Sequence, residues 1–137
     1  MVTGSEPRKE KALPFTSVTR TREGGLTVFK VRGEANPSAF IDAFRDFLTD
    51  PTRLALWDMR GCQLARLDPD RLRQLVGNMK RFDHSKRPRA KTAFVCRTED
   101  DANVMRLQVA YAEAIDYWTE MAVFGSVTQA QHWLAED

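Results

Sequence analysis

The sequence has little of the chemistry that marks most enzymes and metalloproteins. Its 137 residues include two cysteines and two histidines, and none stands at the spacing of a metal site or of a Cys-x-x-Cys redox motif. It has no GxxxxGK[ST] or GxGxxG phosphate-binding loop and no GxSxG nucleophile elbow. We therefore predict no metal site, no cofactor and no catalytic residue, and we expect that the chain is not an enzyme.

Long apolar runs and a strong charge imbalance are also missing. No apolar run exceeds four residues, so we expect no membrane span. The 21 Lys and Arg residues against 19 Asp and Glu residues leave a net charge of +2, which is too small for a dedicated nucleic-acid binder. The N-terminus is charged but has no apolar stretch behind it, which is not typical of a secretory signal. We expect a cytoplasmic protein whose thiols stay reduced.

What the sequence does contain indicates one folded domain. A hydrophobic share of 42% and a charged share of 29% are typical of a globular protein of ordinary core size. Residues 1–13 are polar and charged, and we predict that they form a disordered tail. Residues 14–137 are predicted to form a single domain.

The apolar pattern of that domain alternates between strands and helices. A glycine pair separates two segments rich in Thr, Val and Phe, which is typical of a hairpin. An Asn or Asp followed by Pro, or a Thr followed by acids, marks three helix starts. Predicted strands lie at 15–22, 26–33, 54–57, 90–96 and 121–124, and predicted helices at 37–48, 69–82, 99–118 and 127–134. The fold class is therefore α/β, with a five-stranded, mostly parallel sheet, an antiparallel N-terminal hairpin and four helices.

Several side chains follow predicted strands at the edge where open α/β sheets bind ligands. Asp58 and Arg60 follow the apolar strand 54–57. Cys96 ends the strand 90–96, Arg97 follows it, and Ser126 follows the strand 121–124. We predict that these five residues form a ligand site, in which Asp58 and Arg60 stand at the mouth of an apolar pocket. The more ordinary interpretations stay open: Asp58 pairs with Arg60, and the cysteine is a small core residue.

A basic stretch joins the second helix to the following strand. It contains Lys80-Arg81 and, after four residues, Lys86-Arg87-Pro88-Arg89. Such a stretch can bind nucleic acid or acidic headgroups, but cations are also favourable at the end of a helix. We expect a solvated loop.

Short motifs along the chain resemble one known family. They are the strand end Trp-Asp-Met-Arg-Gly at 57–61, the helix start Asp-Pro-Asp-x-Leu at 68–72, the pair Met105-Arg106, and the closing segments 123–124 and 130–134. Together they resemble the SpoIIAA-like family of small bacterial proteins, relatives of the STAS (anti-sigma-factor antagonist) domain, over residues 15–135. The resemblance implies a non-catalytic regulatory or interaction module with a protein partner or a second copy, as a dimer. Some relatives look like lipid carriers, which implies a small apolar ligand as the alternative.

The best-known STAS mechanism is a switch, in which a serine at the start of the second helix is phosphorylated. The matching segment here, residues 66–72, contains neither Ser nor Thr. The resemblance therefore implies a module that lacks the phosphorylatable serine. It also implies that the second helix carries the interaction surface, which we assign to Asp68, Asp70, Arg71, Arg73, Gln74 and Asn78.

Overall fold

Five strands form one sheet whose spatial order follows the sequence. The computed structural model describes residues 16–85 and 87–136, so the tail predicted for residues 1–13 lies outside the described residues. The strands are β2 (Thr16–Glu23), β3 (Leu26–Glu34), β4 (Leu54–Gln63), β5 (Lys91–Val95) and β6 (Glu120–Phe124). The helices are α1 (Pro37–Phe47), α2 (Pro69–Phe82), α3 (Glu99–Ala114) and α4 (Val127–Ala135).

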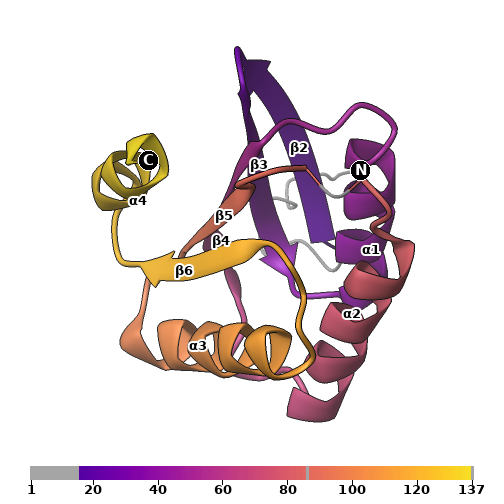
Figure 1. Ribbon diagram of the computed structural model, residues 1–137. Coiled ribbons are helices and arrows are strands. Elements are labelled where there is room, and N and C mark those ends of the chain that lie inside the picture. Colours follow the sequence, from indigo (N-terminus) through magenta and orange to yellow (C-terminus); the bar gives the residue numbers. More distant parts are fainter. Residues whose placement is uncertain (1–15, 86, 137) are drawn as a thin grey trace, which may run out of the picture.

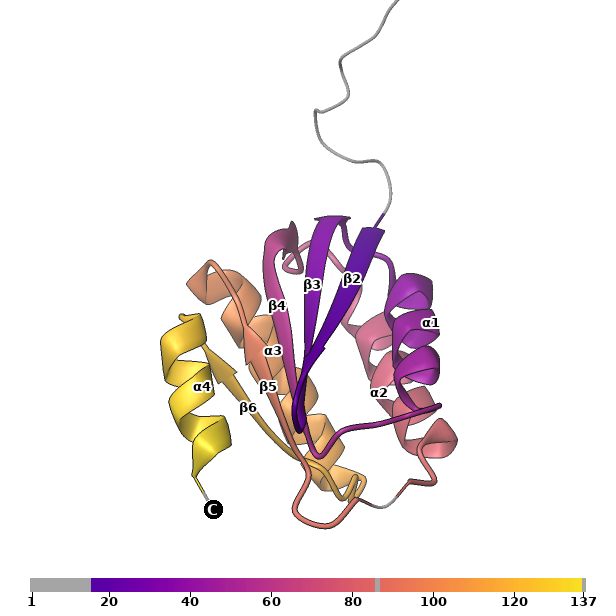
Figure 2. The ribbon, with the colours of Figure 1, turned by 90° about the horizontal axis from the view of Figure 1, so that it is seen from above.

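The sheet has the predicted mixture of strand directions. β2 and β3 form an antiparallel hairpin that turns at Gly24, where φ is +60° and a side chain would be strained. The pairs β3–β4, β4–β5 and β5–β6 are parallel. Helices α1, α2 and α3 cover one face of the sheet, and α4 covers the other (Figures 1 and 2). The predicted fold class is confirmed.

The four helices begin where the sequence signals place them. The side chains of Asn36, Asp68, Thr98 and Ser126 accept hydrogen bonds from backbone amides of the first turns of α1, α2, α3 and α4, at 2.9, 2.9, 3.1 and 3.2 Å. Each bond satisfies an amide that has no partner inside the helix. Proline at the first position of α1 and α2 adds a backbone already set for the helix.

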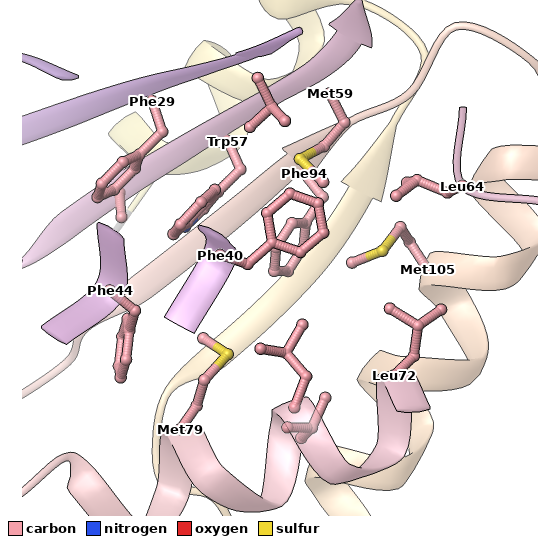
Figure 3. Close-up of a cluster of buried hydrophobic side chains, with 14 of the residues drawn as sticks. Phe29, Phe40, Phe44, Trp57, Met59, Leu64, Leu72, Met79, Phe94 and Met105 are labelled. Atoms are coloured by element: carbon pink, nitrogen blue, oxygen red, sulfur yellow. The ribbon is translucent and has the colours of Figure 1, made fainter. Parts of the chain in front are cut away.

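Two apolar cores lie on the two faces of the sheet. In the larger core Phe29 stacks on Trp57 with ring centroids 3.9 Å apart, and Phe40 of α1 meets Trp57 edge-on (Figure 3). The smaller core packs Leu56 and its β5 neighbours against α4. Because β4 is covered on both faces, its run at 54–57 is apolar without alternation.

Two element boundaries differ from the prediction. β4 does not end at residue 57 but continues to Gln63, which pairs with Glu34 of β3. Helix α3 ends at Ala114 rather than near residue 118, because Asp116 adopts a left-handed conformation (φ 58°) and the Tyr117 amide donates to the Ala112 carbonyl at 2.9 Å. This 6→1 bond, typical of the Schellman motif, closes the helix before its apolar pattern stops.

The basic loop between α2 and β5 is not uniformly solvated, and that expectation is wrong for Arg87. Its side chain is 11% exposed and lies between the rings of Phe47 and Trp118, with the guanidinium carbon 5.0 and 5.2 Å from their centroids. It pairs with Asp83, a fully buried carboxylate, at 3.2 Å. The hydroxyl of Tyr117 also donates to Asp83, at 2.8 Å. The loop is therefore anchored in the core by a charged pair.

Candidate functional site

Asp58 lies inside β4, paired with Lys30 and Val95 of the neighbouring strands. Its carboxylate oxygens accept two hydrogen bonds from the guanidinium of Arg60, from Nε and from one terminal nitrogen, both at 2.8 Å. These bonds outweigh the effect of burial and lower the pKa of Asp58. Asp58 is thus an ionised group whose charge Arg60 neutralises. This is the more ordinary of the two interpretations, in which Asp58 pairs with Arg60 rather than binding a ligand.

Asp58 and Arg60 do not stand at the mouth of the larger core. Side chains alternate along a strand, so Asp58 shares the face of Leu56, which packs toward α4. Trp57 and Met59 face the opposite way, into the larger core. The sheet itself therefore separates the pair from the apolar interior that was expected to open beside it.

The other three predicted ligand residues have separate positions at the carboxyl edge. Cys96 is buried in the larger core, Arg97 is exposed, and Ser126 uses its hydroxyl to cap α4. Burial, with a smaller effect of the Asp101 carboxylate, raises the pKa of Cys62 to about 11 and that of Cys96 to about 12. Thiols that stay protonated near neutral pH are poor nucleophiles, which disfavours chemistry at Cys96.

The strand order explains why these residues do not line one crevice. Ligand crevices of open α/β sheets form where the strand order reverses, because neighbouring crossover helices then leave on opposite faces. In the described sheet the order β2-β3-β4-β5-β6 has no reversal. A hollow of about 280 Å³ does lie at this edge, but it is lined by Glu34, Ala35, Gln63, Arg66 and Leu67. Sequence reasoning missed Gln63 because it ended β4 six residues too early.

Asp101 is a second residue whose role the sequence did not reveal. It is 4% exposed, and its Oδ1 accepts hydrogen bonds from the backbone amides of Leu64 and Ala65 at 3.0 and 2.8 Å. This carboxylate joins the start of α3 to the segment that leads from β4 into α2. In the sequence it is one of three consecutive acids, and nothing local separates it from Glu99 and Asp100.

The outer surface of α2 lies between two open grooves. One, the α1–α2 groove, has a volume of about 350 Å³ and is lined by Asn36, Pro37, Ser38, Ile41, Asp42, Arg71, Gln74, Leu75 and Asn78. The other, the α2–α3 groove, has a volume of about 660 Å³ and is lined by Asp70, Arg73, Gln74, Gly77, Asn78, Arg81 and Tyr111. Gln74 and Asn78 line both grooves and therefore stand on the ridge between them.

Five of the six predicted interaction residues line these grooves. We call them the α2 ridge: Asp70, Arg71, Arg73, Gln74 and Asn78. Within the ridge Asp70 forms an ion pair with Arg73, and Asn78 accepts a hydrogen bond from Arg81 at 2.6 Å. The sixth residue, Asp68, is exposed at the start of α2 and caps it. The structure thus brings the predicted surface together on one side of a helix.

Two kinds of site find no support in residues 16–85 and 87–136. No group of three or more His, Cys, Asp or Glu side chains there is arranged to hold a metal ion. No helix in the same part of the chain is long and apolar enough to cross a membrane.

Comparison with known proteins identifies the fold. No protein-family model matches the chain, and no curated protein matches it in sequence. Among solved structures it is similar to the crystal structure of an anti-sigma factor antagonist from Mycobacterium paratuberculosis, with a TM-score of 0.66 and 13% identity. The match covers 91% of this chain and 99% of that one. The resemblance predicted from the sequence motifs is confirmed at the level of the fold.

Proposed function

We propose that this chain is a non-catalytic interaction module that binds a protein partner through the α2 ridge. The observation that carries the proposal is the position of the ridge: its polar and charged side chains stand between two open grooves, while the apolar side of α2 is buried in the larger core.

The chemistry of the ridge fits a protein surface better than a small molecule. Pockets for small molecules are mostly apolar with a few polar groups. The ridge instead presents charges of both signs, Asp70 beside Arg71 and Arg73, with the amides of Gln74 and Asn78 between the grooves. Such a pattern selects a partner through charge complementarity and hydrogen bonds at a polar surface. The charges also suit a second copy of the chain, since in a two-fold interface Asp70 of one copy can pair with Arg71 or Arg73 of the other.

The structural neighbour supports the class of partner. An anti-sigma factor antagonist, by its description, acts against another protein. We extend that class, a protein partner, to this chain. We carry over no partner identity and no pathway, because at 13% identity the similarity concerns the fold.

We further propose that the interaction is not controlled by phosphorylation at the start of α2. Residues 66–72 contain no hydroxyl side chain. Asp68 caps the helix and Asp70 lies in its first turn, so two carboxylates already occupy the end where helix dipoles favour negative charge. None of the five ridge side chains carries a hydroxyl group either, so the charge of the ridge itself does not depend on a kinase.

Site-specific photo-crosslinking tests the proposal. A photoreactive amino acid replaces Gln74 on the ridge in one protein, and Gln131, exposed on α4, in a matched control. Irradiation in a lysate of the source organism, followed by mass spectrometry, should yield one dominant protein adduct from position 74 and none from position 131. Native mass spectrometry of the purified chain distinguishes a second copy from a different partner.

The affinity of the variant Arg71→Glu/Arg73→Glu for the partner, or for a second copy, provides a quantitative test. Reversing both charges should weaken the partner or the dimer about tenfold or more, which corresponds to about 1.4 kcal/mol. Far-UV circular dichroism checks that α2 still forms. Equal adducts from positions 74 and 131, or unchanged affinity in the charge-reversed variant, would refute the assignment of the ridge.

A further inference from the structure

The outer side of β2 is an open edge of the sheet. β2 is the first strand in the order β2-β3-β4-β5-β6, and all eight of its residues pair with β3 on the inner side. No strand among residues 16–85 and 87–136 pairs with its outer side. An edge strand presents a row of backbone N–H and C=O groups with which another strand can pair.

β2 lacks the features that usually keep such an edge from pairing, which are a very short strand, proline, lysine or a bulge. It has eight residues with no proline or lysine, and its pairing with β3 has no register shift. Its two arginines form ion pairs with acids of α1 and of the loop that follows it, Arg20 with Asp46 and Arg22 with Asp50. β6, at the other edge of the sheet, has five residues and packs against both α3 and α4. Of the two edges, β2 is therefore the one that suits a partner strand.

The symmetry of a dimer restricts how two β2 strands can pair. A two-fold axis perpendicular to the sheet places the two strands side by side in antiparallel direction, with the α1 helices of both copies on the same face of the joined sheet. Directly opposite side chains of an antiparallel pair lie on the same face. Because neighbouring residues of a strand alternate between faces, the pairing must be centred on one residue that lies opposite its own copy.

The arginines select this central residue. A centre at Arg20 or Thr21 places one arginine directly opposite another, which is destabilising. A centre at Val18 gives a shorter pairing of the described strand. A centre at Thr19 pairs residues 16–22 and keeps every arginine opposite an uncharged residue. The resulting pairs are Thr19 with its own copy, Ser17 with Thr21, Val18 with Arg20, and Thr16 with Arg22.

The side chains that meet in this register are compatible. Val18 packs against the larger core, so Ser17, Thr19 and Thr21 lie on the opposite face of β2. On that face the register places hydroxyl-bearing side chains opposite one another, and cross-strand pairs of Thr with Thr or Ser are favourable. Both arginines already have an acidic partner within their own copy, so neither brings an uncompensated charge to the joined edges.

We propose that a second copy of this chain pairs with the open edge of β2, in an antiparallel register centred on Thr19, so that one sheet runs through both copies. Backbone hydrogen bonds supply the affinity, as in other cases of strand addition, and the paired side chains fix the register. The proposal uses no residue of the α2 ridge, so it stands or fails separately from the proposed function.

Cysteine crosslinking tests the register. Thr19 and Thr21 are both exposed on the same face of β2, and the two native cysteines are buried. In the proposed dimer the two Cα atoms of position 19 lie about 4.5–5.5 Å apart, within the range of a disulfide. Those of position 21 lie roughly 14 Å apart, which is too far for one. Under mild oxidation Thr19→Cys should therefore form a covalent dimer at least about tenfold faster than the matched control Thr21→Cys.

Sedimentation velocity measures the association itself. The wild-type chain should show a monomer–dimer equilibrium between about 10 µM and about 1 mM. Thr19→Lys places two lysines opposite each other across the axis, beside Lys30 of each copy, and should weaken the dimer at least about fivefold. Thr21→Lys, whose lysine lies opposite Ser17, should change the affinity less than about twofold. Far-UV circular dichroism checks that both variants are folded.

Three results would overturn the proposal: a wild-type chain that stays monomeric up to about 1 mM, a dimer that Thr19→Lys leaves unchanged, or equal rates of crosslinking at positions 19 and 21. The variant Arg71→Glu/Arg73→Glu should leave this dimer intact, because the ridge is not part of the pairing. If that variant alone disrupts the dimer, the second copy binds at the ridge and not at β2.

Discussion

Replacing Arg87 by methionine should destabilise this protein far more than replacing Arg81, an exposed arginine of the same basic stretch. Its guanidinium pairs with the buried Asp83, donates to the Thr52 carbonyl at 2.5 Å, and lies between the rings of Phe47 and Trp118. Methionine keeps much of the apolar stem and removes the charge. The Asp83 carboxylate then stays buried with Tyr117 and Ser85 as its remaining donors.

The size of the effect follows from the burial of the pair. Removing one partner of a buried ion pair costs about 3–5 kcal/mol, because it leaves an uncompensated charge inside the protein. Domains of this size are stable by about 5–15 kcal/mol in total, so Arg87→Met removes a large part of the stability. With a urea dependence of about 2 kcal/mol per molar, the unfolding midpoint should fall by about 2 M. Arg81→Met, at an exposed position of the same basic stretch, should change the stability by less than about 0.5 kcal/mol.

Urea unfolding followed by circular dichroism measures these values, and a double-mutant cycle with Asp83→Asn isolates the pair. The double variant should lose about 2 kcal/mol less than the sum of the two single variants, because the second substitution removes a charge that the first left unpaired. A loss below about 1 kcal/mol for Arg87→Met, or strict additivity, would show that Arg87 does not compensate Asp83 and would refute the reasoning.

Three further predictions concern other buried groups. Because Arg60 lowers the pKa of Asp58 in the folded state, the stability from this pair is present above about pH 4 and is lost as the pH falls through the lower folded pKa. The urea midpoints of Asp58→Asn should therefore depend less on pH below about pH 4 than those of the wild type. Asp101→Ala should lower the free energy of unfolding by about 2–4 kcal/mol, since it removes the acceptor of two backbone amides; a thermal scan showing an unchanged midpoint would contradict this role. Cys62 and Cys96, with pKa values of about 11 and 12, should react with Ellman's reagent at pH 8 only after the protein is unfolded.

Helix starts, helix faces and the order of strands and helices were readable from the sequence because they depend on neighbouring residues. The caps at Asn36, Asp68, Thr98 and Ser126 each act on an amide within three residues along the chain. The exposed side of α2 follows from the 3.6-residue period of its apolar partners, so the ridge residues could be named before their grooves were known.

Other features depended on pairs of residues far apart in the chain, and only the tertiary structure decided them. β4 continues past Trp57 because Gln63 pairs with Glu34, and Arg87 is buried because Phe47 and Trp118 flank it. The burial of Gln108 has no local signal either, since the residues that surround its side chain come from other elements of the larger core. Short-range hydrogen bonding and periodicity determine which elements form, whereas burial, charge pairing and cavity shape arise only when distant segments meet.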